Sequence, residues 1–218
     1  MRWAWDNREQ VIDLTLTHAW LSLVPMLLGF VIALPVGWYA SRHRRLRGSL
    51  LSAGSILYSV PSLPLFVILP GILGTGFLSP VNVVVALTIY AAAIMVRSAA
   101  DAFGSVSPAV LDAAESAGYS SRQRGLGVEL PLAGPVLLAG LRVVSVSTVS
   151  LVSVGALIGV SNLGSFFTDG YRRDFPTEIL VGVAGIVVLA VLFDALLVLA
   201  GRILMPWASI SRPAGAVE

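Results

Sequence analysis

The sequence predicts an all-α polytopic membrane protein with about five transmembrane helices. Hydrophobic residues make up 56% of the 218 residues and charged residues only 12%, whereas about a quarter of the residues are charged in ordinary soluble proteins. The apolar residues fall into five long runs, each long enough for the roughly 20 residues that cross about 30 Å of hydrocarbon. The chain is therefore expected to form a single transmembrane domain over residues 1–218, without a large water-soluble domain beside it.

The five predicted spans are separated by short polar segments. We expect them at about residues 19–41, 50–73, 81–100, 132–160 and 178–205. A cleaved signal peptide is an alternative for the first run, but the leading segment MRWAWDNREQVID is not net positive and the run is longer than a signal core. The first run is therefore expected to remain as a span.

The arginines indicate how the spans are oriented. They cluster between the first and second spans, around the loop after the third span, and at the end of the chain, at Arg42, Arg44, Arg45, Arg47, Arg97, Arg122, Arg124, Arg202 and Arg212. Cytoplasmic loops carry the excess of positive residues in membrane proteins. The other two loops, at 74–80 and 161–177, carry no net charge. This pattern predicts that the N-terminus lies outside and the C-terminus in the cytoplasm.

The second span contains two prolines that should bend or interrupt its helix. Pro61 and Pro64 remove backbone donors, and lipid tolerates the freed backbone groups only where protein or water covers them. Ser59 and Ser62 lie beside these prolines. The four residues are therefore candidates for a solute pathway or gate, with a static kink as the alternative.

The polar segment between the third and fourth spans is predicted to form two helices joined by a tight turn. Ser107 and Pro108 are typical of a helix start, and Gly118 is typical of a left-handed helix terminator. Pro131 then ends a second short helix. A connector that only joined two spans would not need this construction. We therefore expect the loop at 107–131 to contact a partner.

Residues at fixed spacings in this loop carry a resemblance to a known family. They are Asp112, Ala113, Ala114, Gly118, Val128, Leu130 and Pro131. The pattern resembles the cytoplasmic signature loop of ABC importer permeases, in which Glu-Ala-Ala, a glycine four residues beyond the second alanine, and Ile-x-Leu-Pro follow at these spacings. Asp112 stands here for the glutamate and Val128 for the isoleucine. Three longer stretches, 58–70, 128–142 and 156–170, resemble the permeases of glycine betaine, choline and carnitine importers.

The fourth span and the segment after it carry further pathway candidates. Ser147, Ser150 and Ser153 form a ladder at a spacing of three residues. Such hydroxyl groups either line a polar path or bond the carbonyl group one turn back. Asn162 and Gly164 lie in an irregular external loop. The resemblance implies a role for this loop in the outer gate, and a plain re-entrant turn is the alternative.

Two opposite charges lie deep inside the predicted spans. Arg142 is about ten residues into the fourth span and Asp194 about eleven residues from the end of the fifth, so both lie roughly 15 Å from the cytoplasmic end of their helices. An unpaired charge at this depth is costly. We therefore expect Arg142 and Asp194 to form an intramembrane ion pair.

The resemblance implies the permease subunit of an ATP-driven importer for quaternary ammonium osmoprotectants such as glycine betaine or choline. In such systems an external solute-binding protein delivers the solute, and a separate ATP-binding subunit, which binds ATP and magnesium, docks on the cytoplasmic loop. A second permease, either the same chain or a similar one, completes the transporter in the bacterial inner membrane. The chain itself is then expected to have no catalytic residues, no cofactor, no metal and no nucleic-acid partner, and to contact the lipid bilayer.

Two alternative functions remain at this point. An ABC permease for another small solute, such as an amino acid, would have the same five-span plan. An ion-coupled secondary transporter belongs to a different class and predicts internal repeats and several intramembrane carboxylates. The sequence shows no repeat, and only Asp194 lies deep in a span.

Overall fold

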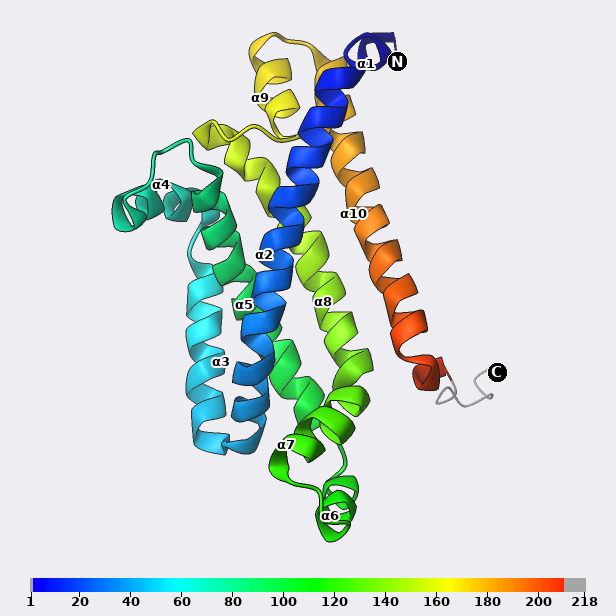
Figure 1. Cartoon of the computed structure of the whole chain (residues 1–218). Helices are drawn as coiled ribbons and strands as arrows, with labels where there is room; N and C mark the ends of the chain where they lie inside the picture. The colour runs from blue at the N-terminus through cyan, green and yellow to red at the C-terminus, as the bar shows by residue number, and fades with distance from the viewer. Residues whose placement is uncertain (1, 210–218) are drawn as a thin grey trace, which may run out of the picture.

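The computed structural model describes residues 2–209 as a bundle of helices (Figure 1). Its elements are α1 (Arg2–Asp6), α2 (Arg8–Arg42), α3 (Arg44–Ser59), α4 (Ser62–Leu73), α5 (Pro80–Gly104), α6 (Pro108–Ser116), α7 (Ser121–Arg124), η1 (Gly125–Glu129), α8 (Leu130–Val152), η2 (Ser153–Ile158), α9 (Ser165–Arg172), α10 (Pro176–Leu204) and η3 (Pro206–Ser209). The η1 segment is a turn of π-helix, and η2 and η3 are 3₁₀-helices. Within residues 2–209 there is no strand, which confirms the all-α prediction.

Four helical segments are long and apolar enough to cross a membrane. They are Arg8–Arg42, Pro80–Gly104, Ser121–Ile158 and Pro176–Leu204. Helix α2 starts at Arg8, eleven residues before the predicted start of the first span at residue 19, because the polar residues before the apolar run continue the same helix. A fifth crossing is present if the bent pair α3 and α4 is counted as one span.

The predicted single span at 50–73 is in fact two helices that meet at an angle of 98°. Pro61 fixes its own backbone and disfavours a helical conformation for the residue before it, and both Val60 and Pro61 are extended. The hydroxyl group of Tyr90 on α5 donates a hydrogen bond of 2.5 Å to the carbonyl oxygen of Val60. The predicted interruption therefore becomes a sharp turn that is held from the neighbouring helix.

Small residues bring α2 and α5 into close contact. Gly29 faces Ala91, and a Cβ atom added at Gly29 would lie 2.5 Å from the Cβ atom of Ala91 and 2.8 Å from the backbone nitrogen of Ala92. Gly37 faces Ala99 in the same way. Glycine and alanine at such positions let helix backbones approach in a membrane protein, where van der Waals packing drives helix association. This contact forms the centre of the bundle together with α8.

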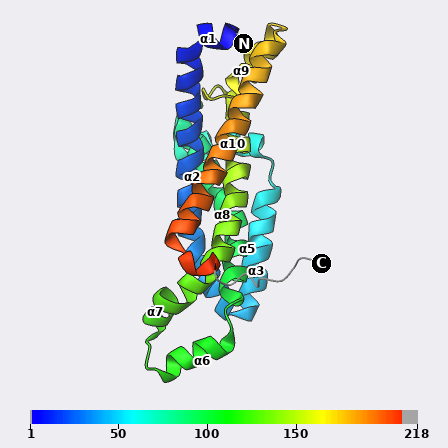
Figure 2. The same cartoon turned by 90° about the vertical axis from the view of Figure 1, so that its right-hand side faces the viewer.

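The two ends of the bundle differ in what they carry. Helices α6 and α7 project beyond one end, which we call the loop end, whereas α1 and α9 lie at the opposite end (Figures 1 and 2). Helix α10 stands at the edge of the bundle, packed against α8 and α9. Much of its surface is uncovered within the chain, with exposed apolar residues on several sides.

Candidate functional site

The segment at the loop end folds as the predicted helix, turn and helix. Helix α6 has Ser107 before it and Pro108 in its first turn. Gly118 follows the helix with a φ of +83°, a conformation that residues with a Cβ atom rarely adopt. The amide group of Gly118 donates to the carbonyl oxygen of Glu115 at 2.9 Å, and that of Tyr119 donates to Ala114 at 3.1 Å. The glycine therefore ends α6 and turns the chain toward α7.

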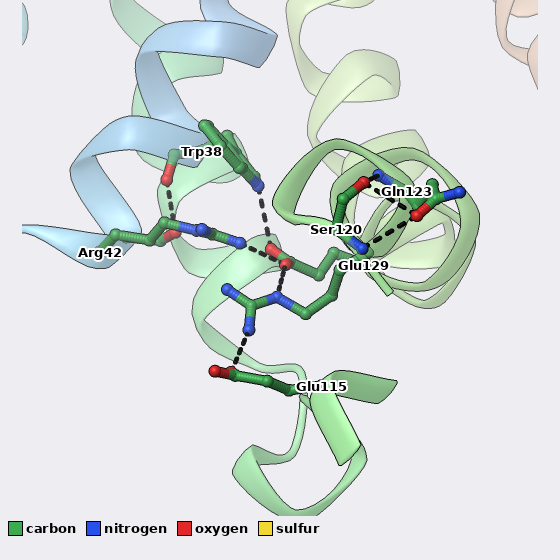
Figure 3. A network of polar contacts seen from close by, with 8 residues as sticks. Trp38, Arg42, Glu115, Ser120, Gln123 and Glu129 are labelled. Carbon is green, nitrogen blue, oxygen red and sulfur yellow. Dashed lines mark hydrogen bonds and ion pairs between the residues drawn. The ribbon is translucent and has the colours of Figure 1, made fainter. Parts of the chain in front are cut away.

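Helix α7 begins with a reciprocal cap. The amide group of Gln123 donates to the hydroxyl oxygen of Ser120 at 3.4 Å, and the amide group of Ser120 donates to the side-chain oxygen of Gln123 at 2.9 Å. This arrangement is a capping box, which satisfies two donors that the start of a helix leaves free. Figure 3 shows the cap beside the other polar contacts of the loop. A four-residue helix thereby obtains a defined start.

The motif residues divide between an exposed tip and a half-buried base. Asp112, Ala113 and Gly118 are exposed on α6 and its turn, whereas Ala114 faces inward. The remaining motif residues, Val128, Leu130 and Pro131, are half-buried where η1 joins α8. The tip therefore offers a free surface, and the base connects it to a membrane helix.

Glu129 is the residue of this site that sequence reasoning missed. Its side chain is only 3% exposed and accepts hydrogen bonds from the indole Nε1 of Trp38 at 2.9 Å, from the guanidinium group of Arg42, and from Nε of Arg124 at 3.3 Å. Arg124 also donates to Glu115 on α6 at 2.9 Å. Figure 3 shows this network, which joins the end of α2 to both helices of the loop. A carboxylate inside the otherwise apolar stretch after residue 125 was the available signal.

The polar network lies beside an apolar groove at the base of the loop. A groove of about 410 Å³ borders the base of the loop and is lined mainly by apolar side chains, among them Trp38, Phe103 and Leu126. A buried carboxylate is stable only when its lone pairs are satisfied, and here Trp38, Arg42 and Arg124 satisfy them. The guanidinium group of Arg42 also lies over the ring of Trp38, 4.1 Å from its centroid. The loop is therefore attached to α2 as well as to α5 and α8.

The pathway candidates of the second span lie on the uncovered surface of the chain. Ser59, Pro61 and Pro64 are exposed, and Ser62 is half-buried. The hydroxyl group of Ser59 donates to the carbonyl oxygen of Ile56 at 2.7 Å. The structure therefore places these residues together at the bend, where a partner, lipid or solute can reach them.

The pathway candidates at and beyond α8 have different environments. Ser150 is exposed, while Ser147 and Ser153 are half-buried, and the hydroxyl group of Ser153 donates to the carbonyl oxygen of Ser150 at 2.6 Å. Asn162 and Gly164 are buried, and the side chain of Asn162 accepts from the amide group of Gly164 at 2.7 Å. Asn162 thus stabilises the turn before α9.

Arg142 and Asp194 lie in contact, as their equal depth suggested. Nε and one terminal nitrogen of Arg142 donate to the two carboxylate oxygens of Asp194 at 2.6 and 2.8 Å. The pair joins α8 to α10 and is exposed on the surface of the chain. Within the described residues 2–209 no cluster of three or more histidine, cysteine, aspartate or glutamate side chains has the arrangement of a metal site.

Curated proteins of similar sequence are permeases. The chain is 28% identical over 200 residues to the choline transport system permease protein OpuBB of Bacillus subtilis, which covers 92% of this chain and 91% of the relative. It is 30% identical over 195 residues to the osmoprotectant import permease protein OsmW of Salmonella typhimurium, and the match covers 88% of this chain and 90% of the relative.

Solved structures and a family model agree with these relatives. The inward-facing MetNI methionine ABC transporter has a chain of the same fold, with a TM-score of 0.74, 23% identity, and 95% of this chain and 99% of that chain covered. The family model described as binding-protein-dependent transport system inner membrane component matches residues 16–209. The chain is thus a multi-pass permease subunit rather than an enzyme, and it belongs to the family of inner membrane components of binding-protein-dependent transport systems.

Proposed function

We propose that this chain is the transmembrane permease of an ATP-driven importer for quaternary ammonium osmoprotectants such as glycine betaine or choline. The observation that carries the proposal is the helix–turn–helix site at residues 107–131, with its exposed tip and its buried Glu129 network. The substrate class is supported by the relatives, which include permeases for choline, for osmoprotectants, and for glycine betaine, carnitine and choline.

The exposed tip is the surface that docks a separate ATP-binding subunit. Asp112, Ala113 and Gly118 lie on this tip, and the small side chains let a partner approach closely. ATP and magnesium bind to that partner. The loop end then faces the cytoplasm, which agrees with the arginines near it, such as Arg42, Arg122 and Arg124. Movement of the docked partner reaches α8 through the continuous helix and α2 through Glu129.

The solute path runs between this chain and a second permease, either another copy or a similar chain. The residues that we assign to the path or its gate are Ser59, Pro61, Ser62, Pro64, Ser147, Ser150 and Ser153. The opposite end of the bundle, which carries α9, receives an external solute-binding protein. Asn162 and Gly164 support this end through the buried turn before α9.

Reconstituted transport tests the proposal. Proteoliposomes would contain this chain, its ATP-binding subunit and its second permease, with the loaded binding protein outside. We expect uptake of radiolabelled glycine betaine or choline that requires ATP and magnesium at the ATP-binding subunit and stops when that subunit is omitted. Uptake driven by an ion gradient without ATP would instead indicate a secondary transporter. ATP-dependent uptake of an amino acid, with neither osmoprotectant transported, would replace the substrate class.

A further inference from the structure

The Arg142–Asp194 pair lies at mid-depth on the uncovered surface of the chain. Arg142 follows the first residue of α8 by 12 positions and Asp194 precedes the last residue of α10 by 10 positions, so both are roughly 15 to 18 Å from those helix ends. The Arg142 side chain is 44% exposed and that of Asp194 is 32% exposed. Two charges at this depth therefore face something other than this chain.

The pair leaves hydrogen-bonding groups unused. A guanidinium group carries five N–H donors in a fixed plane. Among residues 2–209, the hydrogen bonds of Arg142 go to Asp194 alone and use Nε and one terminal nitrogen. Its remaining N–H groups have no acceptor there. Hydrocarbon offers none, and charged groups inside membranes face a protein interior or a water-filled cavity. The face that carries the pair is thus not directed toward lipid tails.

Two serines lie on the same side of α8 as Arg142, nearer to the end that carries α9. Ser150 and Ser153 lie eight and eleven positions after Arg142, which places all three within about 80° of one another around the helix. Ser150 is exposed, and Ser153 is half-buried at the start of η2. The three residues are spread from mid-depth toward the end that carries α9. Polar groups thus recur on this side of α8, with the exposed Val146 between Arg142 and the two serines, and polar groups that face away from the rest of the chain can line a hydrated path.

We propose that this face lines the solute path and that Arg142 binds the carboxylate group of a zwitterionic solute there. The inference rests on the proposed function and deepens it, because it assigns the site within the membrane that recognises the solute. The free N–H groups of Arg142 match a carboxylate in geometry and charge. The carboxylate of Asp194 lies beside them and attracts the quaternary ammonium group of the same solute. Glycine betaine and carnitine carry both groups, whereas choline carries a hydroxyl group in place of the carboxylate.

The test compares uptake of glycine betaine and choline by the complete reconstituted transporter. The measured quantity is the ratio of glycine betaine uptake to choline uptake, and each variant's ratio is divided by that of the wild type. Because the same binding protein is used throughout, its own preference between the two solutes cancels in this comparison. Arg142→Lys keeps the positive charge and removes the planar fork. We expect it to lower glycine betaine uptake relative to choline by about tenfold, the effect of losing one strong charge-assisted contact. Arg47→Lys, in the exposed pair with Asp101, is the matched control and should leave the ratio unchanged.

A charge exchange separates recognition from structure. The double variant Arg142→Asp with Asp194→Arg restores an ion pair between α8 and α10 but moves the positive charge to the other helix. We expect it to assemble and to lose glycine betaine uptake. Restored uptake at the wild-type ratio would show that the pair is only structural, and an unchanged ratio in Arg142→Lys would overturn the inference even if the exchanged chain does not fold. A wild type that transports neither solute would overturn the proposed function itself.

Discussion

The indole Nε1 of Trp38 donates a hydrogen bond of 2.9 Å to Oε2 of Glu129, although 91 positions separate the two residues. The contact attaches the last turns of α2 to the base of the loop that we assign to ATPase docking. Helix α5 directly precedes the loop in sequence and packs along α2 at the centre of the bundle. A displacement of the loop would therefore act on α2, which is remote from it in sequence, as well as on α5.

Removal of the Glu129 carboxylate should destabilise the chain. Glu129→Ala leaves the indole N–H of Trp38 without its partner and two arginines beside each other. We expect a loss of about 2–4 kcal/mol in the free energy of unfolding, measured by thermal unfolding of the purified chain in detergent. Asp101→Asn is the control, because the Arg47–Asp101 pair is exposed on both sides and should contribute under about 1 kcal/mol. Equal and small shifts for both variants would contradict a structural role for the network.

The cap of α7 should depend on one hydroxyl group. Ser120→Ala removes the acceptor for the amide group of Gln123, and loss of such a cap costs about 1 kcal/mol. Hydrogen exchange of the α7 amides should therefore become several-fold faster. Ser116→Ala, at an exposed position of the same loop, should leave that exchange unchanged. If both variants behaved alike, the cap would not determine the stability of α7.

The bend between α3 and α4 should loosen when the hydroxyl group of Tyr90 is removed. Tyr90→Phe keeps the buried ring and loses the hydrogen bond to Val60, which is worth about 1 kcal/mol. Amide exchange across residues 59–65 should accelerate roughly fivefold. Tyr58→Phe is the control, since the Tyr58 ring packs edge-on against Tyr90 while no hydrogen bond of its hydroxyl group is found within residues 2–209. Acceleration in Tyr58→Phe alone would refute the role of Tyr90.

Two glycines on neighbouring helices should respond differently to substitution by alanine. Gly29→Ala places a Cβ atom against Ala91 and the backbone of α5, and such overpacking costs about 1–3 kcal/mol. Gly48→Ala enters open space on α3 and should be neutral or stabilising by up to about 1 kcal/mol, because alanine is the better helix former. Thermal unfolding of both variants measures the difference. A neutral Gly29→Ala would show that α2 and α5 separate easily.

Much of the architecture follows from local sequence signals. Apolar runs of sufficient length predict the long helices, Pro61 predicts the interruption of the second span, and Gly118 predicts the turn because only glycine adopts its φ readily. The equal depth of Arg142 and Asp194 predicted their ion pair. This inference was possible because α8 and α10 are helical from the loop end to those positions, so that sequence distance converts directly into depth. These predictions need only helical geometry.

The Glu129 network could not be predicted because it depends on an irregular turn and on distant partners. Residues three or four positions apart are neighbours on an α-helix, so Arg124 and Glu129, five positions apart, would not meet on one. The π-turn of η1, with its hydrogen bond from Leu130 to Gly125, brings them together. The bend between α3 and α4, at 98°, is likewise held by a contact from another helix, the hydrogen bond from Tyr90 to Val60. Tertiary contacts of this kind carry no local pattern.

The most direct test of the central claim is ATP-dependent uptake of radiolabelled glycine betaine by the reconstituted complex with Gly118→Pro in this chain. Proline cannot adopt the φ of +83° and lacks the amide that bonds Glu115, so the docking loop changes while the membrane helices remain. Gly127→Ala, in open space within the same loop, is the control. If the loop transmits ATP hydrolysis, Gly118→Pro lowers uptake at least about tenfold in a folded chain, a change equal to the loss of one to two strong contacts. Uptake at the wild-type rate by a folded Gly118→Pro chain would contradict the assignment of this loop as the coupling site.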